Sequence, residues 1–167
     1  VLEVKQVSAY NNDNVKTLKD VSFDVREGEI FGIAGVSGNG QTDLYEAVTA
    51  LLEVSSGEIR INGTLISQRI SFNGWHELNV AEIPEDRIEH GSIGSMTLEE
   101  NIIFGNHRKK DYQSNGVLNW HAISELARKR IKEYDVRPDN IKHHAGALSG
   151  GNLQKLILSR ELSNSPR

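Results

Sequence analysis

Two glycine-containing turns in this sequence have the residue types and spacing that bind phosphate groups. The first lies in Leu148–Lys155, where Ser149, Gly150 and Gly151 precede an apolar run that predicts a helix. Glycines lack a Cβ, so a ligand can approach the backbone closely, and the free N–H groups at a helix start attract anions. Serine is also a preferred helix N-cap. This Ser-Gly-Gly turn (Ser149–Gly151) alone is therefore compatible with an ordinary helix start.

The second turn, Gly35–Thr42, is called the phosphate loop here. It follows the apolar run Ile30–Ala34, which predicts a buried strand, and precedes the helical pattern Leu44–Leu51. A strand, a glycine-rich loop and a helix in this order are the context of a P-loop. The candidate phosphate-binding residues are Gly35, Ser37, Gly38, Asn39, Gly40, Gln41 and Thr42. A glycine-rich turn without a ligand is the alternative for this loop considered alone.

Gln41 is the one residue that departs from the P-loop pattern, because it stands where such loops carry lysine. Consecutive backbone N–H groups can still form an anion nest. Thr42 is placed where a hydroxyl binds Mg²⁺. Loss of the charged contact costs about 1.5–3 kcal/mol of phosphate binding. The sequence therefore predicts a weak phosphate loop.

Composition limits the classes of function that remain. The 167 residues are 37% apolar and 25% charged, contain no cysteine and carry a net charge of −4. Disulfides and thiolate zinc sites are excluded, and the absence of cysteine fits a cytosolic location. The acidic balance argues against a general nucleic-acid binder. No apolar run approaches the length of a membrane span, so membrane association is expected only through a partner.

The apolar periodicity predicts strands first and helices later. Strands are expected over 1–7, 21–25 and 79–83, and a hairpin over 58–66 around Asn62-Gly63, after a break at Ser55–Gly57. Helices are expected from Thr97, which forms a capping box with Glu100, and from Asn119 to about Tyr134. The polar segment 106–118 is expected to be irregular.

This order of elements resembles the nucleotide-binding domain of ATP-binding-cassette (ABC) ATPases, whose signature motif is similar to Leu148–Lys155. The resemblance implies an α/β P-loop NTPase fold with an antiparallel β-subdomain and a helical insert. The division it implies is 1–96 for the β-subdomain and partial core, 97–147 for the helical subdomain, and 148–167 for the signature motif and its helix.

Within that family, the chain resembles the second cassette of tandem ATPases that import simple sugars and nucleosides. The matching segments are 29–41, 83–87, 134–137 and the signature. Glutamine at the lysine position is typical of the nucleoside branch, whereas the sugar branch more often has arginine. The resemblance therefore favours a nucleoside importer and leaves a sugar importer open.

The resemblance also implies the ligands, which are ATP and Mg²⁺. Glu85 matches a position where the family has a glutamine that contacts Mg²⁺ and senses the membrane subunit, and we interpret Glu85 as a coupling residue more than a catalytic one. Tyr10 is a candidate to stack on adenine, with a surface tyrosine as the alternative. His143-His144 is interpreted as a solvated loop, since adjacent side chains of an extended segment point apart.

In the family, each nucleotide lies between the P-loop of one cassette and the signature of the other. The resemblance thus implies a second cassette and transmembrane permease subunits as partners, at the cytoplasmic face of the bacterial plasma membrane. It also implies that the Walker B strand and its catalytic glutamate follow Arg167, so this chain is expected to have an incomplete core and to hydrolyse no ATP alone. Two rival interpretations are an ABC ATPase without a membrane partner and a non-hydrolytic dimerisation cassette.

Overall fold

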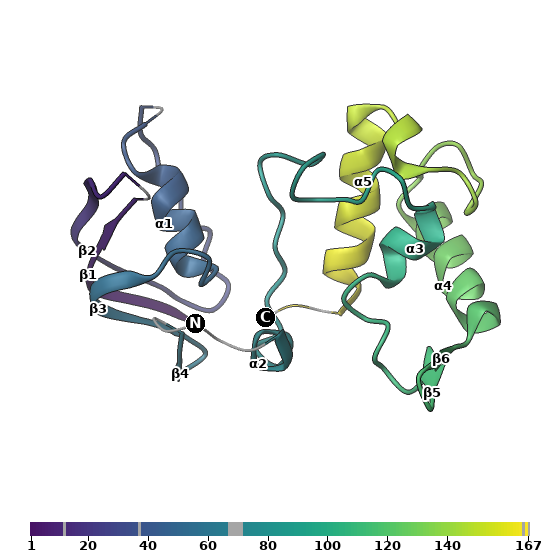
Figure 1. Ribbon diagram of the computed structural model, residues 1–167, viewed down its shortest axis with the longest axis horizontal. Helices are drawn as coiled ribbons and strands as arrows, with labels where there is room; N and C mark the ends of the chain where they lie inside the picture. The colour runs from purple at the N-terminus through teal and green to yellow at the C-terminus, as the bar shows by residue number, and fades with distance from the viewer. Residues whose placement is uncertain (12, 37, 67–71, 165, 167) are drawn as a thin grey trace. The chain divides into compact units, whose positions relative to one another are not determined.

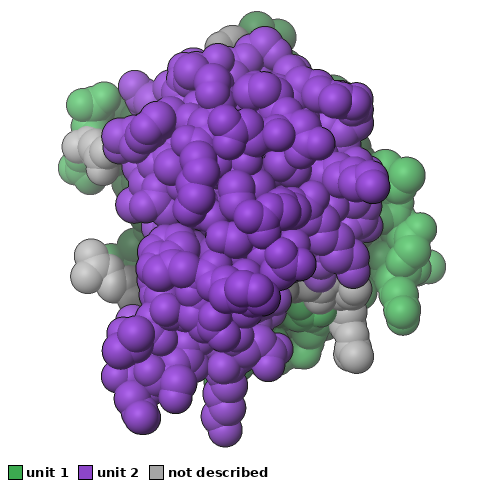
Figure 2. Space-filling view, turned by 90° about the vertical axis from the view of Figure 1, so that its right-hand side faces the viewer, with its two compact units in different colours: residues 1–80, 167 green, residues 81–166 purple. Residues whose placement is uncertain are grey.

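The computed structural model describes residues 1–11, 13–36, 38–66, 72–164 and 166. The chain folds into two compact units, an N-terminal unit of residues 1–80 and a C-terminal unit of residues 81–166. Figure 1 shows the elements of each unit, and Figure 2 colours the two units separately. Each unit has its own apolar core.

The N-terminal unit is an antiparallel sheet packed against one helix. Its strands β1 (Leu2–Tyr10), β2 (Lys16–Val25), β3 (Val54–Ile61) and β4 (Thr64–Leu65) lie in the order β2-β1-β3-β4. The helix α1 (Gln41–Val48) lies beside the sheet (Figure 1). It buries Leu44 and Ala47 in the same core as the apolar face of the sheet. A short helix α2 (Phe72–Glu77) follows the sheet. The predicted strands at 1–7 and 21–25 are confirmed.

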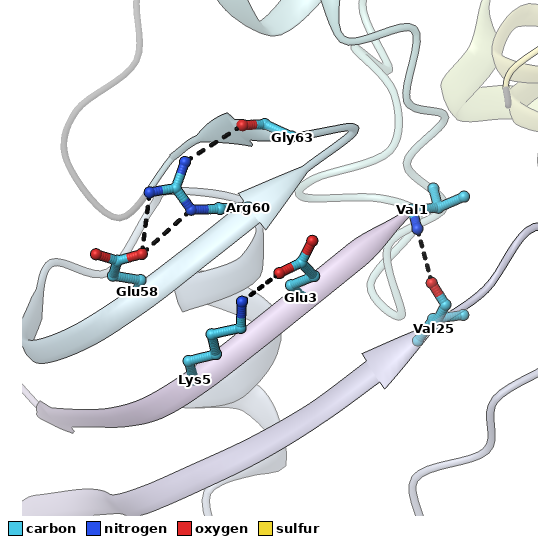
Figure 3. Close-up of polar contacts among 7 residues, drawn as sticks. All are labelled: Val1, Glu3, Lys5, Val25, Glu58, Arg60 and Gly63. Carbon is cyan, nitrogen blue, oxygen red and sulfur yellow. Dashed lines mark hydrogen bonds and ion pairs between the residues drawn. The ribbon is translucent and has the colours of Figure 1, made fainter.

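The other face of this sheet carries charged side chains. Glu3 pairs with Lys5 on β1, and Arg60 pairs with Glu58 on β3 at 3.0 Å (Figure 3). The hydrogen bond and charge of Lys5, with Arg60 nearby, hold the pKa of Glu3 below its usual value. Alternating residues of a strand point to opposite faces, so one face is buried and the other is solvated.

The hairpin predicted around Asn62-Gly63 is confirmed, with both turn residues at positive φ (50° and 79°) as a type I′ turn requires. The predicted break at Ser55–Gly57 is wrong, because these residues lie inside β3. β1 bulges at Gln6, which has φ of 49°, and Gly57 faces that bulge. A Cβ on Gly57 would lie 2.4 Å from the Gln6 carbonyl oxygen. Glycine is often found where a strand ends, but here the absence of a Cβ lets Gly57 lie inside β3 against the bulge of β1.

The strands predicted at 30–34 and 79–83 are also wrong. Both segments lack a ladder partner among the described residues and have no regular secondary structure. Ile30 is 99% exposed and Ile33 is 51% exposed, so this run is not buried either. The Phe31 ring stacks on Phe23 of β2 with ring centroids 5.0 Å apart. An apolar run becomes a strand only where another strand pairs with it.

The C-terminal unit is a small helical bundle. It contains α3 (Leu98–Ile103), α4 (Trp120–Glu133), α5 (Gly150–Glu161) and two 3₁₀ turns, η1 (Ala145–Ala147) and η2 (Leu162–Asn164). Its core combines Leu98, Ala127, Ile131, Leu153 and Leu156 with their neighbours. The predicted helices from Thr97 and Asn119 are confirmed. The segment expected to be irregular instead contains a hairpin, β5 (Gln113–Ser114) and β6 (Val117–Leu118), around Asn115-Gly116.

The capping box of α3 is present as predicted. The Thr97 hydroxyl accepts a hydrogen bond from the Glu100 backbone N–H, and the Glu100 carboxylate accepts bonds from the Thr97 N–H and hydroxyl at 2.7 Å each. These hydrogen bonds from Thr97 hold the pKa of Glu100 below its usual value.

We expect this box to make the stability of the protein pH-dependent. Because the folded pKa of Glu100 is depressed, its contribution is present above the unfolded value of about 4.3 and is lost as pH falls through the lower folded value. Glu100→Gln does not titrate there. Urea denaturation should therefore show a stability difference between wild type and Glu100→Gln that is largest near about pH 7 and shrinks towards about pH 3. A difference that stays constant over that range would contradict the assignment.

Candidate phosphate-binding sites

The phosphate loop is positioned by β2 on one side and α1 on the other. Asn39 N–H donates to the Val36 carbonyl at 3.1 Å, and Leu44 N–H donates to Gly40 O at 2.9 Å to begin α1. Gly40 is the N-cap, with φ of 84°, and a Cβ there would lie 3.0 Å from Thr17 O on β2. The loop is thus held against the sheet at Gly40, while Gly35, Gly38, Asn39 and Thr42 are exposed. Ser37 lies outside the described residues.

Gln41 turns back over the loop instead of extending away from it. A Cβ placed on Gly35 would lie 3.1 Å from Gln41 Nε2 and 3.2 Å from its Cδ. The amide therefore occupies the space next to the start of the loop. Asp43 stands in the first turn of α1, a residue that our sequence reasoning did not weigh. Its negative charge opposes a phosphate at the helix start, although it favours the helix dipole.

Tyr10 ends β1 in the same unit and is 44% exposed. It pairs with Lys16 on β2, and the next residue, Thr17, is the one that lies against Gly40. The structure therefore brings the end of β1 and the phosphate loop together through β2. An open hollow of about 530 Å³ on this sheet is lined by 1–5 and 22–26 and contains none of the candidate residues.

The Ser-Gly-Gly turn begins α5, whose first turn is exposed. Ser149 is the N-cap as predicted, and its carbonyl accepts a hydrogen bond from Leu153 N–H at 2.9 Å. A Cβ on Gly151 would meet no described atom within 4 Å, so the space over this glycine is open. The backbone N–H groups of a helix start and its dipole attract anions. This arrangement can receive a phosphate at Gly150 and Gly151.

The Ser149 hydroxyl does not cap its own helix. It accepts no backbone hydrogen bond in the part of the chain that the structure describes, and accepts instead from the side-chain amide of Asn152 at 3.1 Å. Asn152 in turn accepts from Arg137 N–H at 2.8 Å. The sequence predicted the N-cap position of Ser149 but did not point to Asn152, whose partner Arg137 is 15 residues away in the chain.

Glu85 lies in the same unit and is exposed, in the turn 85–91, whose last residue Gly91 is buried. Asp86 organises that turn, since its carboxylate accepts from Ile88 and Glu89 N–H, and these bonds lower the pKa of Asp86. Gly91 packs against Ile157 of α5, where a Cβ would lie 2.5 Å from the Ile157 Cδ1 atom. The turn that carries Glu85 is therefore fastened to the helix that follows the Ser-Gly-Gly turn.

A second connection runs through the segment that follows Glu85. Gly146 N–H donates to Gly94 O at 3.0 Å, and Ala145 N–H donates to Met96 O at 3.0 Å. Arg87 reaches the Ser-Gly-Gly turn itself, with its Nη1 atom 3.9 Å from a Cβ built on Gly150. The fully buried Asn101 holds the segment by accepting from Ile93 N–H and donating to three carbonyls. Arg87 belongs to the matching segment 83–87, but the sequence pattern predicted no role for Arg87 or Asn101.

Side chains that could bind a metal ion do not cluster in the described residues. The described residues contain no group of three or more His, Cys, Asp or Glu side chains that could hold a metal ion. In the pair His143-His144, the Nδ1 atom of His144 lies 2.8 Å from the Ser95 carbonyl oxygen. Thr42 belongs to the N-terminal unit and Glu85 to the C-terminal unit.

Comparison with known proteins extends these observations. Residues 18–167 match the family described as "ABC transporter". The chain is 42% identical over 166 residues to the guanosine import ATP-binding protein NupO of Bacillus subtilis, and 39% identical over 167 residues to the nucleoside import ATP-binding protein NupA of Lactococcus lactis. The aligned region covers 99% of this chain in both cases, but only 32% of NupO and 33% of NupA. The chain therefore spans about a third of the length of these relatives.

Other relatives carry different import functions in their names. The glucose import ATP-binding protein TsgD13 of Haloferax volcanii is 38% identical over 168 residues, with 99% of this chain and 30% of that protein covered. Among solved structures, the ATP-binding cassette MJ0796 in a dimeric post-hydrolysis state bound to ADP and Pi superposes with a TM-score of 0.77. The identity is 20%, and the match covers 99% of this chain and 71% of that one. Together with the family match, this similarity shows that the chain belongs to the ABC transporter family and has the ATP-binding cassette fold of a P-loop NTPase.

Proposed function

We propose that this chain is an ATP-binding cassette of a bacterial importer for nucleosides or simple sugars, and that its main contribution is the Ser-Gly-Gly turn. The observation that carries the proposal is the start of α5, where Gly151 faces open space and the Ser149 hydroxyl is not used as a helix cap. Such a turn offers N–H groups, a hydroxyl and a helix dipole to a phosphate. The names of the similar nucleoside and glucose import proteins support an import function.

The proposed ligand is ATP with Mg²⁺, and the bound nucleotide would supply the γ-phosphate that is transferred to water. The chain's own phosphate loop is the weaker half of this chemistry, since Gln41 lies over Gly35 and Asp43 adds a negative charge. We assign Gly35, Ser37, Gly38, Asn39, Gly40, Gln41 and Thr42 to the phosphates and Tyr10 to the adenine. Thr42 and Glu85 are the proposed Mg²⁺ ligands, with Glu85 also sensing the permease.

We further propose that the Ser-Gly-Gly turn acts in trans, on a nucleotide held by the phosphate loop of a second cassette. Ser149, Gly150 and Gly151 would then stabilise the charge on the γ-phosphate, which is where catalysis of phosphoryl transfer mainly acts. The dimeric state named for the similar MJ0796 structure supports such a pairing. In this proposal, the present chain is the second cassette of a tandem ATPase, and the 167 residues alone hydrolyse no ATP because the working site needs both cassettes.

The proposed division within the cassette is 1–96 for the β-subdomain and core, 97–147 for the helical subdomain and 148–167 for the signature helix. The proposed partners are the other cassette and the transmembrane permease subunits, at the cytoplasmic face of the membrane. None of the described helices has the length and apolar character that crossing a membrane requires. The net charge of −4 supports the proposal that nucleic acid is not a partner.

A purely structural, non-hydrolytic dimerisation cassette is the second candidate, and Gln41 is the observation that favours it. The experiment that separates the two is ATP turnover and substrate uptake by the complete ATPase, reconstituted in vesicles with its permease. An importer cassette should show uptake that depends on ATP and on the Ser-Gly-Gly turn. Uptake and turnover that are indifferent to this turn would favour the structural role.

The proposed weakness of the phosphate loop predicts the effect of restoring its lysine. Gln41→Lys should tighten ATP binding to this loop by about tenfold or more, because a charge-assisted hydrogen bond contributes about 1.5–3 kcal/mol. Isothermal titration calorimetry on the purified chain measures the change, with Thr64→Lys as a control that adds the same charge at an exposed position of β4, outside both candidate phosphate sites. Equal affinities for Gln41→Lys and wild type would mean that the loop does not present its backbone to phosphate.

A further inference from the structure

The N-cap serine of α5 is unusual in what its hydroxyl binds. An N-cap serine normally accepts a hydrogen bond from the backbone N–H of the second or third helical residue, which here are Gly151 and Asn152. In this protein the Ser149 oxygen accepts from the side-chain amide of Asn152 instead, at 3.1 Å. The N–H groups of the first turn are therefore left without their usual intramolecular cap.

The orientation of the Asn152 amide is set from outside the helix. Its oxygen accepts a hydrogen bond from the backbone N–H of Arg137 at 2.8 Å. A backbone N–H can only donate, so the amide oxygen must face Arg137 and the NH₂ group must face Ser149. The residue before Arg137 is also held in place, because Val136 is fully buried and its N–H donates to Ile131 O at 2.8 Å.

A second set of contacts fixes the same turn to α5. Lys155 lies three residues after Asn152, on the same side of the helix, and its ammonium donates to Asp135 O at 2.9 Å and to an Asp135 carboxylate oxygen at 3.1 Å. Arg137 Nε donates to the other carboxylate oxygen at 2.8 Å. Lys155 first, and then Arg137, hold the pKa of Asp135 below its usual value. The turn 135–137 is thus tied to α5 at both Asn152 and Lys155.

From these contacts we infer that Asn152 is a positioning residue that keeps the Ser149 hydroxyl and the first-turn N–H groups available to the nucleotide. This inference rests on the proposed function of the Ser-Gly-Gly turn. With one lone pair of the Ser149 oxygen occupied by Asn152, its hydrogen is free to donate to a phosphate oxygen. Without Asn152, Ser149 returns to ordinary capping and competes with the phosphate for the Gly151 and Asn152 N–H groups.

The test is a double-mutant cycle in the complete ATPase with its permease, with kcat and KM for ATP measured at each corner. Ser149→Ala should lower kcat by about tenfold, the size expected from one hydrogen bond to a charged group, and Asn152→Ala should lower kcat by a similar factor. If Asn152 acts through Ser149, the double variant is no worse than Ser149→Ala alone. Losses that multiply, to about a hundredfold, would overturn the inference, because Asn152 would then act independently.

Two further variants separate function from folding. Asn119→Ala removes a comparable amide at the start of α4, where its oxygen accepts from Ala122 N–H at 3.2 Å, and should cost stability without lowering kcat. Asn152→Asp keeps the acceptor for Arg137 and adds a negative charge that favours the start of α5, so it should fold at least as well as wild type and still lose turnover. Full turnover in Asn152→Asp would overturn the inference. Unchanged turnover in Ser149→Ala would refute the proposed function itself, and the inference with it.

Discussion

Replacing Ser149 with Arg is expected to lower the ATPase activity of the reconstituted transporter by at least about 100-fold, the scale on which loss of preorganised charge stabilisation acts. The arginine side chain would fill the open space next to Gly150 and Gly151, where the phosphate is proposed to lie. Gly151→Leu should have the same effect, since any side chain there enters a region that is empty within 4 Å of its Cβ position. ATP turnover and substrate uptake in vesicles measure both variants.

Folding should be nearly intact in both variants. Ser149 and Gly151 are exposed, and substitutions at exposed positions usually change the free energy of unfolding by no more than about 0.5 kcal/mol. Gln41→Ala is the matched control, because it alters the other proposed phosphate site of the same chain and should retain most activity. If Gln41→Ala proved as damaging as Ser149→Arg, both composite sites would have to be treated as working.

Local signals in the sequence were sufficient for most of the helical unit. The Thr97–Glu100 capping box and the Asn119 cap each specify a helix start within four residues, and both are confirmed. The Asn62-Gly63 hairpin is equally local. Asn115-Gly116 carries the same turn signal and could have been predicted by the same rule.

Strand formation depends on pairing, which the sequence pattern does not reveal. Ile30–Ala34 and Asn79–Ile83 have the apolar character of buried strands, but neither segment joins a sheet among the described residues. Gly57 shows the converse, since a glycine predicted to break the chain lies within β3. Gly57 fits within β3 because β1 bulges at Gln6, about 50 residues earlier in the chain. This bulge is visible only in the assembled sheet.

In the candidate sites too, the local motifs could be predicted from the sequence, whereas the distant residues that support them could not. Glycine spacing identified the phosphate loop and the Ser-Gly-Gly turn as candidates, because the chemistry proposed for them resides in consecutive backbone N–H groups. The residues that support them come from elsewhere in the chain, as Thr17 does for Gly40, and as Arg137 does for Asn152. Neither contact has a periodicity or a spacing that a single sequence could show.

Gly57→Ala is expected to be the most destabilising of the small substitutions in the N-terminal unit. The added Cβ would lie 2.4 Å from Gln6 O, 2.5 Å from Lys5 O and 2.6 Å from the Gln6 carbonyl carbon, all backbone atoms that cannot rotate away. The residue also has φ of 90°. A left-handed conformation costs a non-glycine residue about 1–2 kcal/mol, and overpacking adds about 1–3 kcal/mol. The free energy of unfolding should therefore fall by about 2–5 kcal/mol.

Gly63→Ala separates the two contributions to this loss. Gly63 has φ of 79°, but a Cβ there would meet no described atom within 4 Å, so its substitution carries the conformational cost without the collision. Gly32→Ala carries neither and should be close to neutral. Thermal unfolding followed by circular dichroism should show a drop in Tm of at least about 5 °C for Gly57→Ala, with a smaller drop for Gly63→Ala. Equal drops in these two variants would mean that β1 moves away to admit the methyl group, and that its bulge at Gln6 is not a fixed part of the sheet.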